Sequence, residues 1–183
     1  AEFHSNFIIQ TDVEARSLGD LSDLAGELTL TFGSESSTSG HLMPRHFLGK
    51  IGLDPDSSFK SDPNYSGSHD LTWRLVESGA FDIGALNEDV WKRAVRDGAV
   101  DTDKVRLLEK TPPYFDYNWT VTSGVDEKFG DGFTQKIQDA LLDLSYAEHP
   151  EILDLFSTER FIATENANYL TIEQVARDLG IIK

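Results

Sequence analysis

The sequence predicts an α/β fold, because short apolar runs typical of strands alternate with segments whose apolar residues recur at helical spacing. Glycines and prolines stand at the joints between these segments, as turns require. At 183 residues the chain has the length of one ordinary domain, and its aromatic content of 10% favours a packed core over disorder.

The elements expected before residue 70 begin with a strand starting at 7–9 and a short helix over 17–25, which Gly26 ends. A second strand covers 28–32. The helix expected next carries four apolar residues at helical spacing: Leu42, Met43, Phe47 and Leu48. The stretch 51–68 is rich in Asp, Ser, Pro and Gly, and we expect surface loop there with at most one short strand.

The elements expected after residue 70 continue the alternation of helices and strands. A helix lies between Asp70, which is expected to cap it, and Gly79, which would stop it. A buried strand over 80–86, a helix over 88–96 and a further strand over 105–108 follow. The order strand, helix, strand is the repeating unit of an α/β sheet.

The last third of the chain is expected to be mainly helical. The prolines within 111–113 exclude a helix there, and 117–122 is expected to be extended and to cross between lobes. Four apolar residues then recur at helical spacing: Phe133, Ile137, Leu141 and Leu144. Thr171 and Gln174 are expected to form a capping box at the start of the final helix.

The composition excludes several classes of protein. With 32 acidic against 16 basic residues the formal net charge is −16, so the chain has no excess of positive charge for nucleic acid or for anionic membranes. The longest apolar runs fall far short of the roughly 20 residues of a membrane span. With no cysteine, disulfides, thiolate metal sites, Cys nucleophiles and iron–sulfur clusters are excluded.

The five histidines predict neither a metal site nor a cofactor. They are scattered along the chain, without an HExxH motif or a tight cluster with aspartates. His41 and His46 are five residues apart and would not stack on a helix, so both are expected at the surface.

A hydroxyl-rich turn is the expected chemical centre of the chain. Ser37, Thr38 and Ser39 follow a predicted strand and precede a predicted helix. The N–H groups at a helix start are unpaired and lie at the positive end of the dipole, so amides and hydroxyls together could wrap a small oxyanion. The alternative is that one of the three residues is an N-cap and the others are loop.

Catalytic motifs are missing from the same turn. The segment Gly33-Ser34-Glu35-Ser36-Ser37 lacks the last glycine of a G-x-S-x-G nucleophile elbow, and no lysine completes an S-x-x-K motif. Gly40 is followed by His41, so the turn is not a P-loop. The sequence therefore favours binding over hydrolysis at this turn.

Five further residues are candidates for the same site, and four of them have a structural alternative. His69 precedes a predicted helix, where it could donate to an anion or be a half-exposed loop residue. Asn87 ends a predicted strand and could equally cap the next helix. Asp116 could accept from a protonated ligand oxygen or an amine, whereas Tyr114 and Tyr117 fit ligand contact or core packing equally.

Several motifs, taken as a set, resemble the periplasmic phosphonate/phosphite-binding proteins of ABC transporters. Their order and spacing match that family over nearly the whole chain. The motifs are Phe32-Gly33-Ser34-Glu35-Ser36-Ser37-Thr38-Ser39-Gly40 with Pro44-Arg45, Gly67-Ser68-His69-Asp70, Asp82-Ile83-Gly84-Ala85 and Thr111-Pro112-Pro113-Tyr114-Phe115-Asp116-Tyr117. The first of them is fairly specific, and the others are persuasive together.

The resemblance implies a two-lobed, type II-like binding protein without enzymatic activity, in which the ligand is clamped between the lobes. It implies an anion held by the hydroxyl turn, and contacts from residues further along the chain: His69, Asn87, Tyr114, Asp116 and Tyr117. The family carries an earlier lobe segment with aromatic contacts, which this sequence lacks.

The resemblance also implies a division into domains, a set of partners and a location. Residues 1–17 would hold a crossing strand and a remnant of lobe I, 18–110 the α/β lobe II, and 111–183 the return crossing and the C-terminal helical part of lobe I. The partners would be a small oxyanion and an ABC permease, the location periplasmic or extracytoplasmic, and the full-length protein monomeric.

An interaction module without a small ligand is one alternative to a phosphorus oxyanion binder, and two more remain open at this point. One is a binding protein for selenate or sulfate, because the hydroxyl turn does not by itself select phosphorus. The other is a hydrolase-type enzyme that would use Ser37 or Ser39 with His69 as base, which requires the two side chains within hydrogen-bond reach.

Overall fold

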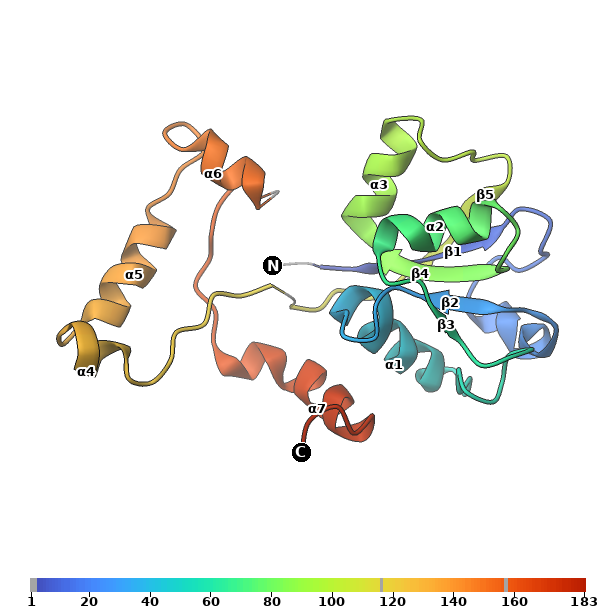
Figure 1. Cartoon of the computed structure of the whole chain (residues 1–183), viewed down its shortest axis with the longest axis horizontal. Coiled ribbons are helices and arrows are strands. Elements are labelled where there is room, and N and C mark those ends of the chain that lie inside the picture. Colours follow the sequence, from blue (N-terminus) through green and yellow to red (C-terminus); the bar gives the residue numbers. More distant parts are fainter. Residues whose placement is uncertain (1–2, 116, 157) are drawn as a thin grey trace. The chain divides into compact units, whose positions relative to one another are not determined.

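The computed structural model describes residues 3–115, 117–156 and 158–183. By its contacts the chain separates into two compact units. The sheet unit comprises 3–115 and 169–183, and the helical unit comprises the described residues of 117–168. Each unit is drawn in Figure 1.

The sheet unit is built on one mixed sheet whose strands follow the order β3-β2-β4-β1-β5. The strands are β1 (Ser5–Gln10), β2 (Leu30–Phe32), β3 (Asn64–Tyr65), β4 (Ile83–Asn87) and β5 (Val105–Lys110). β2 runs parallel to β3 and β4, whereas β1 is antiparallel to β4 and β5. The last residues of β2, β3, β4 and β5 and the first residue of β1 therefore lie at one end, which we name the carboxyl end of the sheet.

Helices cover both faces of this sheet (Figure 1). Phe7 of β1 is buried on the face covered by Leu48 of α1 (Met43–Lys50). Its neighbour Ile8 is buried on the other face, together with Trp73 of α2 (His69–Glu77) and Trp91 of α3 (Glu88–Arg96). Successive strand residues point to opposite faces, so a continuous apolar run fits a strand buried on both sides.

The predicted α/β class is confirmed, and most predicted elements are present. The helix over 88–96 is found with the predicted bounds, and β3 lies within the loop expected at 51–68. The helix expected over 17–25 is replaced by two short 3₁₀ turns, η1 (Gly19–Asp23) and η2 (Ala25–Glu27). Glycine lowers helix stability, and a segment this short has too few hydrogen bonds to compensate.

Both predicted side-chain caps are wrong, because each helix begins earlier than its motif suggested. α2 is capped by Ser68, which has extended backbone and accepts the Leu71 N–H at 3.2 Å, so Asp70 lies within the first turn. α7 (Leu170–Asp178) follows η4 (Asn166–Tyr169) and starts before Thr171, without a side-chain cap.

The helical unit contains α4 (Val125–Phe129), α5 (Phe133–Leu142) and α6 (Pro150–Leu155). α5 confirms the predicted helix, and the described part of 117–122 forms no hydrogen-bonded strand. Within this unit Leu153 is fully buried, whereas many large apolar side chains are exposed: Trp119, Phe129, Tyr146, Leu155, Phe156 and Ile162. Over the described residues, no helix has both the length and the apolarity needed to cross a membrane.

The close contact between α2 and β4 gives the first testable prediction. A methyl group added at Gly84 would lie 2.9 Å from both Thr72 Cγ2 and Val76 Cγ2. Gly84→Ala is therefore expected to lower the free energy of unfolding by about 1–3 kcal/mol, because helix or strand must shift to relieve the overlap. Urea unfolding of both proteins measures this difference.

Gly49→Ala is the matched control, since a methyl group there meets no atom within 4 Å. Gly49 lies in α1, where alanine is favoured over glycine by roughly 0.5–1 kcal/mol, so this variant should be as stable as the original chain or slightly more so. Equal unfolding free energies for Gly84→Ala and the original chain would contradict the packing described here.

Candidate functional site

The hydroxyl turn leaves β2 at the carboxyl end of the sheet and closes on itself before α1. The Gly33 N–H donates to the Gly40 carbonyl at 2.8 Å, and the Ser37 Oγ accepts the Gly40 N–H at 2.9 Å. Ser37 is thus the N-cap of η3 (Thr38–Leu42), a π-helical turn that continues into α1. The N-cap alternative is confirmed for Ser37, but its hydroxyl hydrogen can still donate, because capping uses only an oxygen lone pair.

Thr38 and Ser39 supply the unpaired amides at the start of η3. The first backbone hydrogen bond into this turn is donated by His41 to the Ser37 carbonyl at 3.1 Å. The N–H groups of Thr38 and Ser39 precede that bond, so they have no helical partner and lie at the positive end of the dipole. Ser39 is only 2% exposed, and no hydrogen bond joins its hydroxyl to another described residue.

His69 touches this turn from the start of α2. A Cβ atom built on Gly40 would lie 3.0 Å from His69 Cε1, and one on Gly33 would lie 3.5 Å from His69 Nδ1. Glycine at Gly40 therefore allows the turn to approach the imidazole ring. The pairing of His69 with the hydroxyl turn, predicted from separate motifs, is present in the structure.

The hydrogen bond from Asn87 determines which nitrogen of His69 can donate. The Nδ1 atom of His69 accepts the backbone N–H of Asn87 at 3.3 Å. Burial lowers the pKa of His69, partly offset by the nearby Asp70 carboxylate, which favours the neutral ring at pH 7. A neutral ring that accepts at Nδ1 carries its proton on Nε2, so the free donor of His69 is Nε2–H.

Asn87 is both the last residue of β4 and the N-cap of α3. Its Oδ1 accepts the N–H groups of Asp89 at 2.7 Å and Val90 at 3.1 Å. The capping alternative is therefore confirmed. A contact between Asn87 and a ligand stays a prediction. Only the N–H groups of the side-chain amide could make this contact, because Oδ1 already accepts two hydrogen bonds and the backbone N–H donates to His69.

Tyr114 reaches the same end of the sheet through a contact that the sequence did not reveal. Its hydroxyl lies 2.7 Å from Ser5 Oγ, and Ser5 is paired with Asn87 across β1 and β4. The Ser5 N–H in turn donates to Thr111 Oγ1 at 3.0 Å. Ser5 and Thr111 are fully or nearly fully buried polar residues, and the polar pair Ser5-Asn6 before the apolar run 7–9 is the available sequence signal for Ser5.

Two predicted residues are not placed in this arrangement. Asp116 lies outside the described residues. Tyr117 belongs to the helical unit, where its side chain is 78% exposed. The roles of both in ligand binding stay predictions.

The prediction of a surface position for His41 is wrong. His41 is 6% exposed, because its ring packs against Phe32 and Tyr65 and its Nδ1–H donates to the Glu35 carbonyl at 2.7 Å. Spacing along a helix could not reveal this, since Glu35 lies in the turn before the helix. His46, five residues on, is half-buried, and its Nε2 has no hydrogen-bond partner among the described residues.

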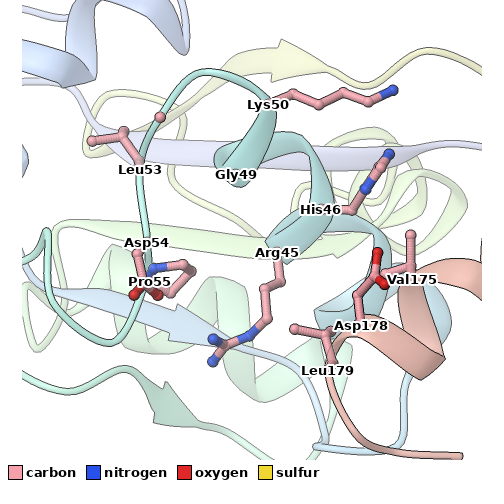
Figure 2. A pocket seen from close by; sticks show the side chains of 11 residues that line it. Arg45, His46, Gly49, Lys50, Leu53, Asp54, Pro55, Val175, Asp178 and Leu179 are labelled. Atoms are coloured by element: carbon pink, nitrogen blue, oxygen red, sulfur yellow. The ribbon is translucent and has the colours of Figure 1, made fainter.

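A cavity of about 450 Å³ lies elsewhere, between α1 and α7 (Figure 2). The side chains of Arg45, His46, Lys50 and Asp178 are on its wall. None of the predicted site residues lines it. The candidate site is the hydroxyl turn rather than this cavity, because only the turn combines unpaired amides, hydroxyls and an imidazole donor.

Comparison with known proteins agrees with the fold. Residues 1–169 match the family described as the phosphonate periplasmic substrate-binding protein of ABC transporters, and the chain belongs to that family. A probable ABC transporter phosphite-binding protein, PhnD1 of Prochlorococcus marinus, is 39% identical over 186 residues. That match covers all of this chain and 63% of the relative, so the chain spans less than two thirds of the relative's length.

Solved structures show the same likeness. The structure of Prochlorococcus marinus PhnD1 in complex with methylphosphonate is 40% identical, with a TM-score of 0.86, over 99% of this chain and 68% of that one. A binding protein component of a phosphonate transporter from Pseudomonas aeruginosa has a TM-score of 0.68 at 23% identity, over 95% of this chain and 56% of that one. The second similarity shows the fold alone.

Three buried or half-buried histidines predict a fall in stability at acidic pH. Burial lowers the pKa of His41, His46 and His69 from the ordinary 6.5. Each ring binds a proton more readily in the unfolded chain, so stability is complete above pH 6.5 and is lost as the pH falls below it. The free energy of unfolding by urea should be lower at about pH 5.5 than at about pH 7.5.

Carboxyl groups ordinarily have pKa values of about 4, below this range, so they are not expected to obscure this comparison. Between about pH 7.5 and 8.5 the three rings are neutral in both states, so the histidines should leave the unfolding free energy unchanged there. An unfolding free energy at pH 5.5 equal to or above that at pH 7.5 would show that these rings are not held neutral by burial.

Proposed function

We propose that this chain is the oxyanion-binding part of the substrate-binding component of an ABC importer, and that its ligand is a phosphonate or phosphite. The observation that carries the proposal is the contact between the hydroxyl turn and His69 at the carboxyl end of the sheet. In open α/β sheets this end is where ligands bind. Family membership supports the same assignment.

The site would hold its ligand with neutral donors. The N–H groups and hydroxyls of Thr38 and Ser39, the Ser37 O–H and the His69 Nε2–H would surround the oxygens of a tetrahedral anion. Neutral donors leave no buried charge when the ligand departs. The net charge of −16 does not oppose this, because charges beyond about 8 Å are largely screened at physiological salt.

Phosphorus ligands are favoured over sulfate-like ions by two considerations. The relative PhnD1 is named as a phosphite-binding protein and its structure holds methylphosphonate. Asp116 would accept a hydrogen bond from a protonated ligand oxygen or an amine, which fully deprotonated sulfate lacks. Tyr114, Tyr117 and Asn87 would complete the contacts, as the resemblance to the family implies.

The protein would capture the oxyanion and deliver it to the permease of an ABC importer. The ligand would be clamped between two lobes, and lobe closure would signal the loaded state to a membrane permease. Such a component would work outside the cytoplasm, and we expect it to be a monomer. Binding is preferred to catalysis, since among the described residues no hydrogen bond joins His69 to a hydroxyl of the turn.

Thermal unfolding against a panel of anions tests the proposal. The panel is phosphite, methylphosphonate, aminoethylphosphonate, phosphate, sulfate and selenate. A ligand at one hundred times its Kd stabilises the folded state by about 2.7 kcal/mol, so phosphite or a phosphonate should raise the unfolding temperature most. Selective stabilisation by sulfate or selenate would overturn the choice of ligand, and turnover of a model phosphoester would overturn the non-enzymatic assignment.

Thr38→Val tests the site itself. The substitution keeps the shape of the side chain and removes one hydroxyl donor, which leaves a ligand oxygen unpaired. The binding free energy of methylphosphonate, measured by titration calorimetry, should become less favourable by about 1–3 kcal/mol. Ser36→Ala is the control, because Ser36 is exposed in the same turn and should leave binding unchanged. Unchanged affinity in Thr38→Val would contradict the site.

A further inference from the structure

His41 lies in η3 directly after the hydroxyl turn, and two hydrogen bonds fix its imidazole. Nδ1–H donates to the Glu35 carbonyl at 2.7 Å, and Nε2 accepts the Arg45 Nε–H at 3.0 Å. A carbonyl only accepts and a guanidinium only donates, so these contacts require a neutral ring protonated at Nδ1. The ring also packs on Phe32, with 5.0 Å between centroids.

The other side of the imidazole is held by charged and aromatic neighbours. Arg45 donates two hydrogen bonds to Asp56, at 2.8 and 2.9 Å. The Tyr65 hydroxyl lies 3.2 Å from both His41 Nε2 and Arg45 Nη2, and the Tyr65 ring stands edge-on to the imidazole at 4.9 Å. A bidentate guanidinium–carboxylate pair has a fixed geometry, so His41 ties the turn to a rigid group.

We propose that His41 is a positioning residue, whose neutral imidazole holds residues 34–39 in the shape that directs the Thr38 and Ser39 donors at the ligand. Glu35 precedes these donors and His41 follows them, so the hydrogen bond between the two closes a ring across the turn. The inference deepens the proposed function and rests on it. Protonation of His41 removes the acceptor for Arg45, loosens the turn and lowers oxyanion affinity.

The charges around His41 agree with a ring kept neutral. Burial lowers its pKa, the hydrogen bond to Glu35 raises it, and the Arg45 guanidinium lowers it again. The Glu35 and Asp56 carboxylates act in the raising direction. The Tyr65 hydroxyl faces the ring from β3, and α7 packs on η3 through the apolar Val175 and Ala176.

Two substitutions separate the hydrogen bonds from the bulk of the ring. His41→Phe keeps an aromatic ring and loses both bonds, whereas His41→Asn keeps a donor near the position of Nδ1 and cannot be protonated. Titration calorimetry with methylphosphonate should show affinity about tenfold weaker for His41→Phe and a smaller loss for His41→Asn, which keeps the bond to Glu35 but not the acceptor for Arg45. Without ligand, amide hydrogen exchange in 34–40 should be fastest in His41→Phe, which loses both bonds.

The pH profile provides a readout that a purely structural role would not move. The ratio of the original chain's Kd to that of His41→Asn should rise as the pH falls from about 7.5 to 5.5. Ionisation of the ligand and of His69 affects both proteins alike and cancels in this ratio. His46→Phe and His46→Asn are the controls, because His46 is half-buried on α1 and makes no hydrogen bond with a described residue of the turn.

The outcomes separate this inference from the proposed function. Binding by the original chain, with affinity and amide exchange unaltered in His41→Phe or a flat Kd ratio, would overturn the role of His41 alone. An equal loss in the His46 variants would also overturn it. Failure of the original chain to bind any anion of the panel would overturn the proposed function and the role of His41 together.

Discussion

The close approach of Gly33, Gly40 and the His69 ring is the constraint on which the candidate site depends. A side chain at Gly40 would lie 3.0 Å from the imidazole and 3.1 Å from Gly33 Cα, so the contact needs a backbone without Cβ atoms. This approach is possible because β2 and β3 are parallel neighbours that end together, and the chain after them leads to η3 and to α2 at the same end of the sheet. Asn87 at the end of β4 then fixes the tautomer of His69. The order of the strands, the two glycines and the Asn87 N–H together bring the neutral donors of the turn and of His69 to one place.

The parts of the fold that could be predicted are those that local pattern determines. The apolar runs at 7–9, 28–32 and 80–86 lie in or overlap strands, and the amphipathic helix 88–96 has its predicted bounds, because periodicity reflects burial directly. Helix starts were less predictable. Ser68 and Asp70 are both good caps, and only the backbone conformation at Ser68 decides between them.

The candidate site could be predicted where its residues are neighbours in the sequence, and could not be predicted where it depends on contacts between residues far apart in the sequence. The hydroxyls of the turn stand in one run, so the anion hypothesis needed no structure. The bond between Ser5 and Thr111 spans 106 positions, and no periodic pattern encodes it. His41 was misplaced at the surface for a related reason, since its burial comes from Glu35 in the loop and from neighbours across the sheet. Sequence identifies the donors, whereas the tertiary structure identifies the groups that orient them.

The central claim is that the oxyanion is held by the amides of the hydroxyl turn and by Nε2–H of His69. Nitrogen–proton NMR of the chain, recorded with and without methylphosphonate, tests it most directly, because it reports the tautomer and the contact surface in one experiment. We expect His69 to carry its proton on Nε2, and that proton and the amides of Thr38 and Ser39 to show the largest shifts on binding. A His69 protonated at Nδ1, or largest shifts around the cavity between α1 and α7, would contradict the account.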